Sequence, residues 1–240
     1  MSDQRSTKTE RTSMRLEQIV FAAVVMLVLP ALILFGAAGR LAWGLGWAYI
    51  GLTLAFVLAS RLILLWQNPD LLAERGQALD NAETEPWDKT LMPLVAMIGP
   101  LIMLLVAGLD QRFGWSPALA PWVPVTAFGV TALGYGLGTW ATVVNHFFSA
   151  VVRIQRERGQ TVVSSGPYGY VRHPGYAATL VTNLTVPLAL GSLWALVPAL
   201  LVNGLLVVRT ALEDRTLQAK LVGYRAYTEQ VRYRLVPGIW

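Results

Sequence analysis

Long stretches without a charged residue constrain this chain more than any other feature. Five such runs cover residues 18–39, 41–60, 90–109, 113–152 and 174–208. A helix crosses a bilayer with about 20 apolar residues, and about 18 uncharged ones already make a candidate. The first run also exceeds the roughly 7–15 apolar residues of a signal peptide. The sequence therefore predicts an all-α, polytopic membrane protein.

The last run is too long for one crossing. Its 35 residues, at about 1.5 Å each, exceed a hydrocarbon core about 30 Å thick. Gly191 and Ser192 lie near its middle and can turn the chain, so we expect a tight helical hairpin there. The count is then about six spans, or five if the hairpin is re-entrant. They cover about residues 18–38, 45–66, 90–109, 121–145, 175–190 and 193–213.

The basic residues give the orientation. With the N-terminus in the cytoplasm, only Arg40 and Arg112 among the basic residues that flank the spans lie outside, as the positive-inside rule requires. This placement explains the net charge of +5 without a nucleic-acid partner. The high content of Ala, Leu, Gly and Pro is typical of a bacterial protein. We therefore expect an inner (cell) membrane protein with both termini cytoplasmic.

Two chemistries are excluded or disfavoured by composition. The chain has no cysteine, which excludes disulfides, thiolate metal sites and a cysteine nucleophile. Its two histidines, His146 and His173, lie apart and lack a set of metal ligands, so no metal site is expected.

Polar residues gather in two stretches that flank the expected hairpin, Gly166–Tyr176 and Arg209–Tyr233. A helical hairpin returns the chain to the side it left, so both stretches should meet on the cytoplasmic side. We therefore divide the chain into an N-terminal membrane anchor, residues 1–120 with about three spans, and a region that carries the chemistry, residues 121–240.

The first stretch has the features of a helix start that binds a ligand. Pro174 keeps His173 extended and suits the first turn of a helix. The free amides of Gly175, Tyr176 and Ala177 would then point at a carboxylate or phosphate, and His173 and Tyr176 could flank it. An interfacial turn that contacts lipid headgroups explains the same spacing equally well.

The second stretch brings charges close to the bilayer. Arg209 and Glu213 are four residues apart and could form a surface ion pair. They are, however, among the first charges after 35 uncharged residues, and ionisable groups at membrane depth tend to face a cavity. Glu213 and Asp214 together would suit a cationic ligand.

The ordered set of motifs resembles the isoprenylcysteine carboxyl methyltransferase family, which is related to the phospholipid N-methyltransferases. The resemblance covers about residues 125–240 and the motifs are Ser165-Gly-Pro-Tyr-Gly-Tyr-Val-Arg-His-Pro-Gly-Tyr176, Arg209-Thr-Ala-Leu-Glu-Asp214, Gly223-Tyr-Arg-Ala-Tyr227 and Val231-Arg-Tyr-Arg-Leu-Val-Pro237. It implies a membrane enzyme that transfers a methyl group from S-adenosylmethionine.

The resemblance also implies roles for single residues. Those expected to bind S-adenosylmethionine are His173, Gly175, Tyr176, Glu213 and Asp214, the last standing where the family usually has a second Glu. Arg209 and Arg172 are the candidate catalytic cations that would hold an acidic acceptor group, although Arg209 could instead only orient Glu213. Weaker candidates for the acceptor site are Asn145, His146 and Tyr224.

Three glycines in the fourth span allow two interpretations. Gly134, Gly136 and Gly138 are similar to a glycine pair that the phospholipid methyltransferases use for the cofactor. Small residues in a membrane helix more often permit close packing of helices.

The acceptor is expected to be a lipidic or isoprenoid carboxylate that enters from the bilayer. A phospholipid amine would use the same C-terminal pattern and would need a proton acceptor such as His173 or Glu213. Sterol or enone reductases, which use NADPH, carry a similar basic-Pro-Tyr element. A scaffold or a transporter is the alternative without catalysis. The chain lacks repeated halves, which argues against a transporter.

Overall fold

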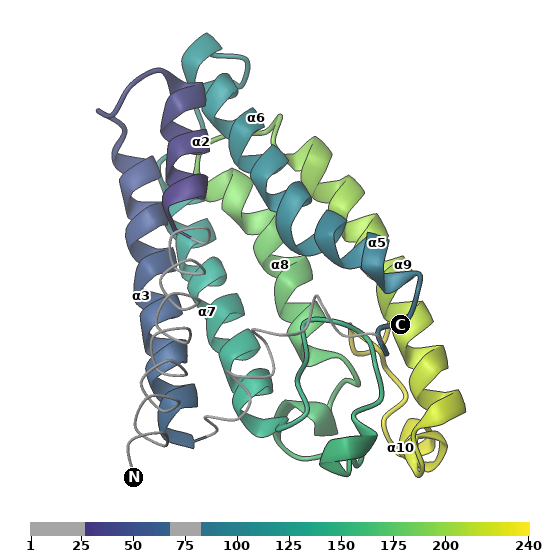
Figure 1. Ribbon diagram of the computed structural model, residues 1–240. Helices are drawn as coiled ribbons and strands as arrows, with labels where there is room; N and C mark the ends of the chain where they lie inside the picture. The colour runs from purple at the N-terminus through teal and green to yellow at the C-terminus, as the bar shows by residue number, and fades with distance from the viewer. Residues whose placement is uncertain (1–26, 68–82) are drawn as a thin grey trace, which may run out of the picture.

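The computed structural model describes residues 27–67 and 83–240. Within these ranges the chain forms a bundle of long helices and contains no β-strand (Figure 1). The helices are α2 (Leu29–Ala38), α3 (Gly44–Gln67), α5 (Asp88–Pro93), α6 (Gly99–Phe113), α7 (Trp122–Val144), α8 (Pro174–Ala189), α9 (Leu196–Lys220) and α10 (Tyr224–Gln230). A π-helical turn, η3 (Leu94–Ile98), joins α5 and α6.

Four of the described helical segments are long and apolar enough to cross a membrane: Gly44–Gln67, Asp88–Phe113, Trp122–Val144 and Leu196–Lys220. The all-α, membrane-embedded class predicted from the sequence is therefore supported. The second and fourth expected spans match α3 and α7 to within one residue at each end. The first expected span, 18–38, ends with α2 as predicted, and its part before residue 27 lies outside the described residues.

The last two expected spans differ from the helices in length. Helix α8 has 16 residues, fewer than the roughly 20 of a full crossing. Helix α9 does not end at residue 213 but continues to Lys220. The turn between them lies at Gly191, as predicted, where φ is +75° and where the Ser192 amide donates to the Pro187 carbonyl. The hairpin is confirmed, whereas the count of six spans stays a prediction.

Helix α7 packs closely against α8. A Cβ on Gly134 would lie only 2.5 Å from Cγ2 of Thr182, so glycine is required for the two helices to approach. Nearby, the hydroxyls of Thr131 and Thr185 form a 2.7 Å hydrogen bond between the same helices. By contrast, a Cβ on Gly136 would meet nothing within 4 Å. The geometry supports the packing interpretation for Gly134.

We predict that Gly134→Ala destabilises the protein by about 1–3 kcal/mol, the usual cost of overpacking. Gly136→Ala should leave stability unchanged or raise it by up to about 1 kcal/mol, because alanine favours the helix. Thermal unfolding of the two variants in detergent measures the difference. Equal effects of the two substitutions would refute the packing role.

Polar contacts fix α8 and α9 to each other. Nδ2 of Asn183 donates to Oδ1 of Asn203 at 2.9 Å, and Nδ2 of Asn203 donates to the Leu180 carbonyl. At the turn, the hydroxyl of Ser192 donates to the buried carboxylate of Asp110. Because the hairpin is held at its turn and along its length, the start of α8 and the end of α9 are brought together at the other end of the bundle.

Candidate active site

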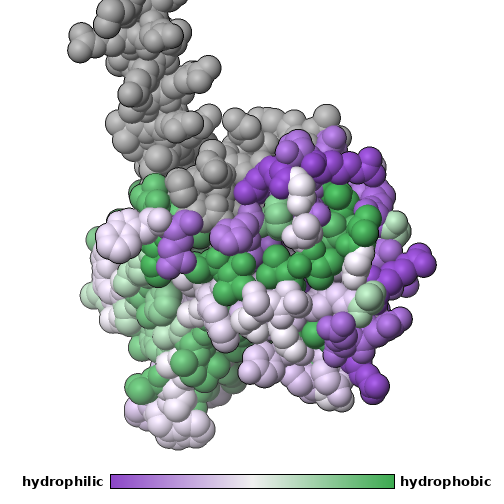
Figure 2. Space-filling view, turned by 90° about the horizontal axis from the view of Figure 1, so that it is seen from below, coloured by the Kyte–Doolittle hydropathy of each residue, from purple (hydrophilic) through white to green (hydrophobic). Residues whose placement is uncertain are grey.

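The end of the bundle opposite the hairpin turn carries most of the irregular structure. The start of α8, the end of α9, α10 and the loop between α7 and α8 meet there (Figure 1). Seen from this end, hydrophilic residues form an arc around apolar ones (Figure 2). Both polar stretches identified in the sequence lie in this region, as the hairpin prediction required.

A cleft opens among these elements, with about 800 Å³ of empty space including the part open to solvent. Its apolar and aromatic lining includes Phe147, Phe148, Val162, Val163, Tyr168, Leu217, Leu221, Tyr224 and Tyr227. Its polar lining includes Asn145, Arg153, Gln160, Thr161, Arg172, His173, Tyr176 and Glu213.

Glu213 and Tyr176 form the polar centre of the cleft wall. The Tyr176 hydroxyl donates to Oε2 of Glu213 at 2.5 Å. The ring of His173 is stacked parallel to that of Tyr176, with centroids 5.7 Å apart. The start of α8 thus presents the His173 imidazole and the Tyr176 phenol to the cleft, and the C-terminal part of α9 presents the Glu213 carboxylate to it.

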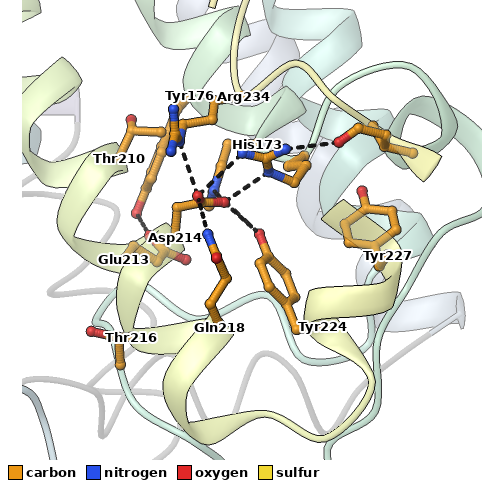
Figure 3. A network of polar contacts seen from close by, with 12 residues as sticks. His173, Tyr176, Thr210, Glu213, Asp214, Thr216, Gln218, Tyr224, Tyr227 and Arg234 are labelled. Atoms are coloured by element: carbon orange, nitrogen blue, oxygen red, sulfur yellow. Dashed lines mark hydrogen bonds and ion pairs between the residues drawn. The ribbon is translucent and has the colours of Figure 1, made fainter. Parts of the chain in front are cut away.

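Asp214 lies beside Glu213 but does not line the cleft. Its carboxylate is fully buried and lies at the centre of a polar network (Figure 3). Oδ1 accepts from Nε of Arg172 at 2.8 Å, and Oδ2 accepts from the same guanidinium at 3.2 Å. The other side chains in contact with this carboxylate are His173, Gln218, Tyr224 and Arg234.

Arg172 is also held by the end of the chain. Its Nη1 donates to the carbonyls of Val231 and Arg232, and its backbone amide donates to the Tyr233 carbonyl. The His173 amide donates to the Arg234 carbonyl at 2.9 Å. The Arg172-His173 turn is therefore fixed both by Asp214 and by the segment that follows α10.

Three buried tyrosines surround the cleft. Burial raises the pKa of Tyr227 to about 12, and burial likewise raises the pKa values of Tyr168 and Tyr224. All three phenols therefore stay protonated near neutral pH and act as donors. Tyr227 donates to the Tyr168 carbonyl at 2.6 Å and Tyr224 donates to Asp214 at 3.1 Å.

Arg209 does not pair with Glu213, contrary to one interpretation of their spacing. Its guanidinium instead binds both carboxylate oxygens of Asp88, at 2.7 and 3.0 Å, and donates to the Ala150 carbonyl. It also lies over the Tyr176 ring, 5.1 Å from the centroid. Arg209 does not line the cleft, so it contacts the site through Tyr176.

Only some of the site residues expected from the sequence therefore line the cleft. Those that line the cleft are Asn145, Arg172, His173, Gly175, Tyr176, Glu213 and Tyr224, whereas His146, Arg209 and Asp214 lie outside its lining. The three glycines of α7 also lie outside it. The expectation that the amides of Tyr176 and Ala177 are free is wrong, because both donate to the His173 carbonyl within the first turn of α8.

Sequence reasoning missed several residues of the site. Asp88 gave no signal, since it belongs to a mixed-charge loop far from the motifs. Tyr168 lies within the Gly-Pro-Tyr-Gly-Tyr motif and could have been singled out as an aromatic next to a turn. Phe148, which would be 2.9 Å from a Cβ on Gly175, shows why residue 175 is small.

The cleft combines aromatic faces with the carboxylate of Glu213. Within residues 27–67 and 83–240, no group of three or more His, Cys, Asp or Glu is placed to hold an ion. Aromatic faces attract a cation such as a sulfonium, and Glu213 can accept hydrogen bonds from hydroxyl or ammonium groups.

Comparison with known proteins agrees with this chemistry. No curated protein matched the chain. Residues 128–219 match the model of the isoprenylcysteine carboxyl methyltransferase (ICMT) family. The match runs from α7 through α8 to the end of α9, and so includes His173, Tyr176 and Glu213. Over this segment, which is less than half of the chain, the protein is similar to the isoprenylcysteine carboxyl methyltransferase family.

Proposed function

We propose that the protein is an S-adenosylmethionine-dependent methyltransferase and that the cleft binds this cofactor. The observation that carries the proposal is the set of His173, Tyr176 and Glu213 on one wall of an aromatic cleft. Glu213 would accept hydrogen bonds from the ribose or the amino group. The aromatic residues would contact the adenine and favour the positive sulfur.

The cofactor, when bound, supplies an electrophilic methyl group on a positively charged sulfur. The protein therefore mainly has to bind, align and exclude water. Tyr176 orients Glu213 through its hydroxyl, and Asp214 and Arg172 hold the turn that carries His173. We assign positioning roles to Asp214 and Arg172, because their charges are directed at each other.

The acceptor is proposed to be a lipidic or isoprenoid molecule. The cleft lies at the end of the membrane-crossing helix α9, so an apolar tail could stay among the helices while the polar end reaches Glu213 and His173. A carboxylate acceptor needs no base near neutral pH. For an amine acceptor, His173 or Glu213 would take the proton.

The site is proposed to face the cytoplasm. Arg153, Arg156, Arg158 and Arg172 lie at this end of the bundle, in the loop between α7 and α8, as the positive-inside rule predicts for a cytoplasmic loop.

Purified protein with S-adenosylmethionine labelled in its methyl group should transfer label to an organic-soluble product when a bacterial lipid extract is added. His173→Ala should lose most of this transfer, and water-soluble carboxylates should accept none. Label that enters water-soluble acceptors equally well would remove the reason for a lipidic substrate. No transfer to any acceptor tested would count against the proposed function.

A further inference from the structure

Asp88 is a fully buried carboxylate that the family match does not reach. It stands in the first turn of α5, 121 residues before its partner Arg209 in α9. Its Oδ1 and Oδ2 accept from Nε and Nη2 of Arg209, and Oδ2 also accepts from the Val152 amide at 2.7 Å. A bidentate bond of this kind fixes a guanidinium in both position and orientation.

The position of Arg209 decides what Glu213 can do. The two residues are four apart in α9, the spacing at which opposite charges on a helix pair readily. Among the described residues, however, the ion-pair partner of Arg209 is Asp88. Glu213 instead accepts from Tyr176, whose ring lies under the Arg209 guanidinium.

We propose that Asp88 is a positioning residue that holds Arg209 away from Glu213 and so keeps Glu213 available to the cofactor. The same bond anchors the Ala150–Val152 segment, since Arg209 donates to the Ala150 carbonyl and Asp88 accepts from the Val152 amide. Val151 and Val152 line the cleft, so Asp88 also holds that part of its wall in place. The inference rests on the proposed function.

The test uses S-adenosylhomocysteine, titrated calorimetrically into the purified full-length protein in detergent. Asp88→Asn should weaken binding about tenfold, a coupling normal for residues in one network, because Arg209 turns to Glu213. Adding Arg209→Gln to Asp88→Asn should restore part of the affinity, since the competing cation is gone. A merely structural role of Asp88 would make the second substitution weaken binding further.

Asp110→Asn is the matched control. Asp110 is 3% exposed, belongs to the same continuous helical segment and bonds to Ser116 and Ser192 away from the cleft. Its substitution should destabilise the protein but leave the affinity of the folded protein unchanged. The proposal is overturned if Asp110→Asn weakens binding as much as Asp88→Asn, if Asp88→Asn binds like the wild type, or if the double variant binds no better than Asp88→Asn.

A further outcome separates this inference from the proposed function. If the wild type itself does not bind S-adenosylhomocysteine, the proposed function fails and this inference fails with it. If the wild type binds, only the comparison among the variants decides the role of Asp88.

Should Asp88→Asn alone fail to fold, the double variant, which leaves no unpaired buried charge, is compared with Arg209→Gln. Equal affinities then support the proposal, and a weaker double variant overturns it.

Discussion

Replacing Asp214 with alanine should lower the free energy of unfolding by about 3–5 kcal/mol, the usual cost of leaving a buried charge without its partner. Arg172 would lose its ionic partner while remaining buried, and Arg234 would lose its carboxylate acceptor. The Arg172-His173 turn would then keep only its bonds to the segment after α10, made by its two backbone amides and by Nη1 of Arg172. Binding of S-adenosylhomocysteine should be lost as well.

Thermal unfolding followed by tryptophan fluorescence measures this effect, since the chain has nine tryptophans. Thiol-reactive dyes are unsuitable because it has no cysteine. Glu229→Ala is the control, because Glu229 is an exposed acid in α10, and its replacement should change stability by no more than about 0.5 kcal/mol. If Asp214→Ala unfolds at the same temperature as this control, the central position assigned to Asp214 is wrong.

Glu213→Gln should weaken the binding of S-adenosylhomocysteine about 10–100-fold. A hydrogen bond to a charged group contributes about 1.5–3 kcal/mol, and each 1.4 kcal/mol corresponds to about tenfold in affinity. Glutamine can still accept from the Tyr176 hydroxyl, so stability should change little. Calorimetric titration of this variant beside Glu229→Gln measures the loss. An unchanged affinity would show that Glu213 does not contact the ligand.

The sequence predicts the helices better than their ends. The run 174–208 correctly indicates a hairpin, since Gly191 can adopt the positive φ of the turn. It does not indicate where α9 ends, because Arg209 and the charges after it end a membrane span but not a helix. Helix α9 continues to Lys220, and this extension carries Gln218 to Asp214.

The motifs predict the part of the site that is local in sequence. His173 and Tyr176 are three residues apart at a helix start, so their shared face follows from helical spacing. The roles of Glu213 and Asp214 could not be separated in this way. Neighbouring residues on a helix differ by about 100° in direction, and only the packing of α9 shows that Glu213 faces the cleft and Asp214 the interior.

Long-range pairs lie beyond what the sequence alone can predict. Asp88 belongs to a mixed-charge stretch and Arg209 follows an apolar run, and no motif or spacing links two residues that are 121 positions apart. Their burial depends on how α5 and α9 pack. The division into an anchor, residues 1–120, and a chemical region, residues 121–240, stays a proposal. The first part contacts the cleft wall through Asp88, which accepts from the Val152 amide, and through the Glu85 amide, which donates to the Val152 carbonyl.

The most direct test of the account is calorimetric titration of the purified wild-type protein with S-adenosylhomocysteine, with NADPH as the comparison ligand. We predict saturable binding of S-adenosylhomocysteine that His173→Ala and Glu213→Ala both weaken, and no binding of NADPH. Binding of NADPH alone, or S-adenosylhomocysteine binding that neither substitution changes, would contradict the assignment of this cleft as the site of a methyl donor.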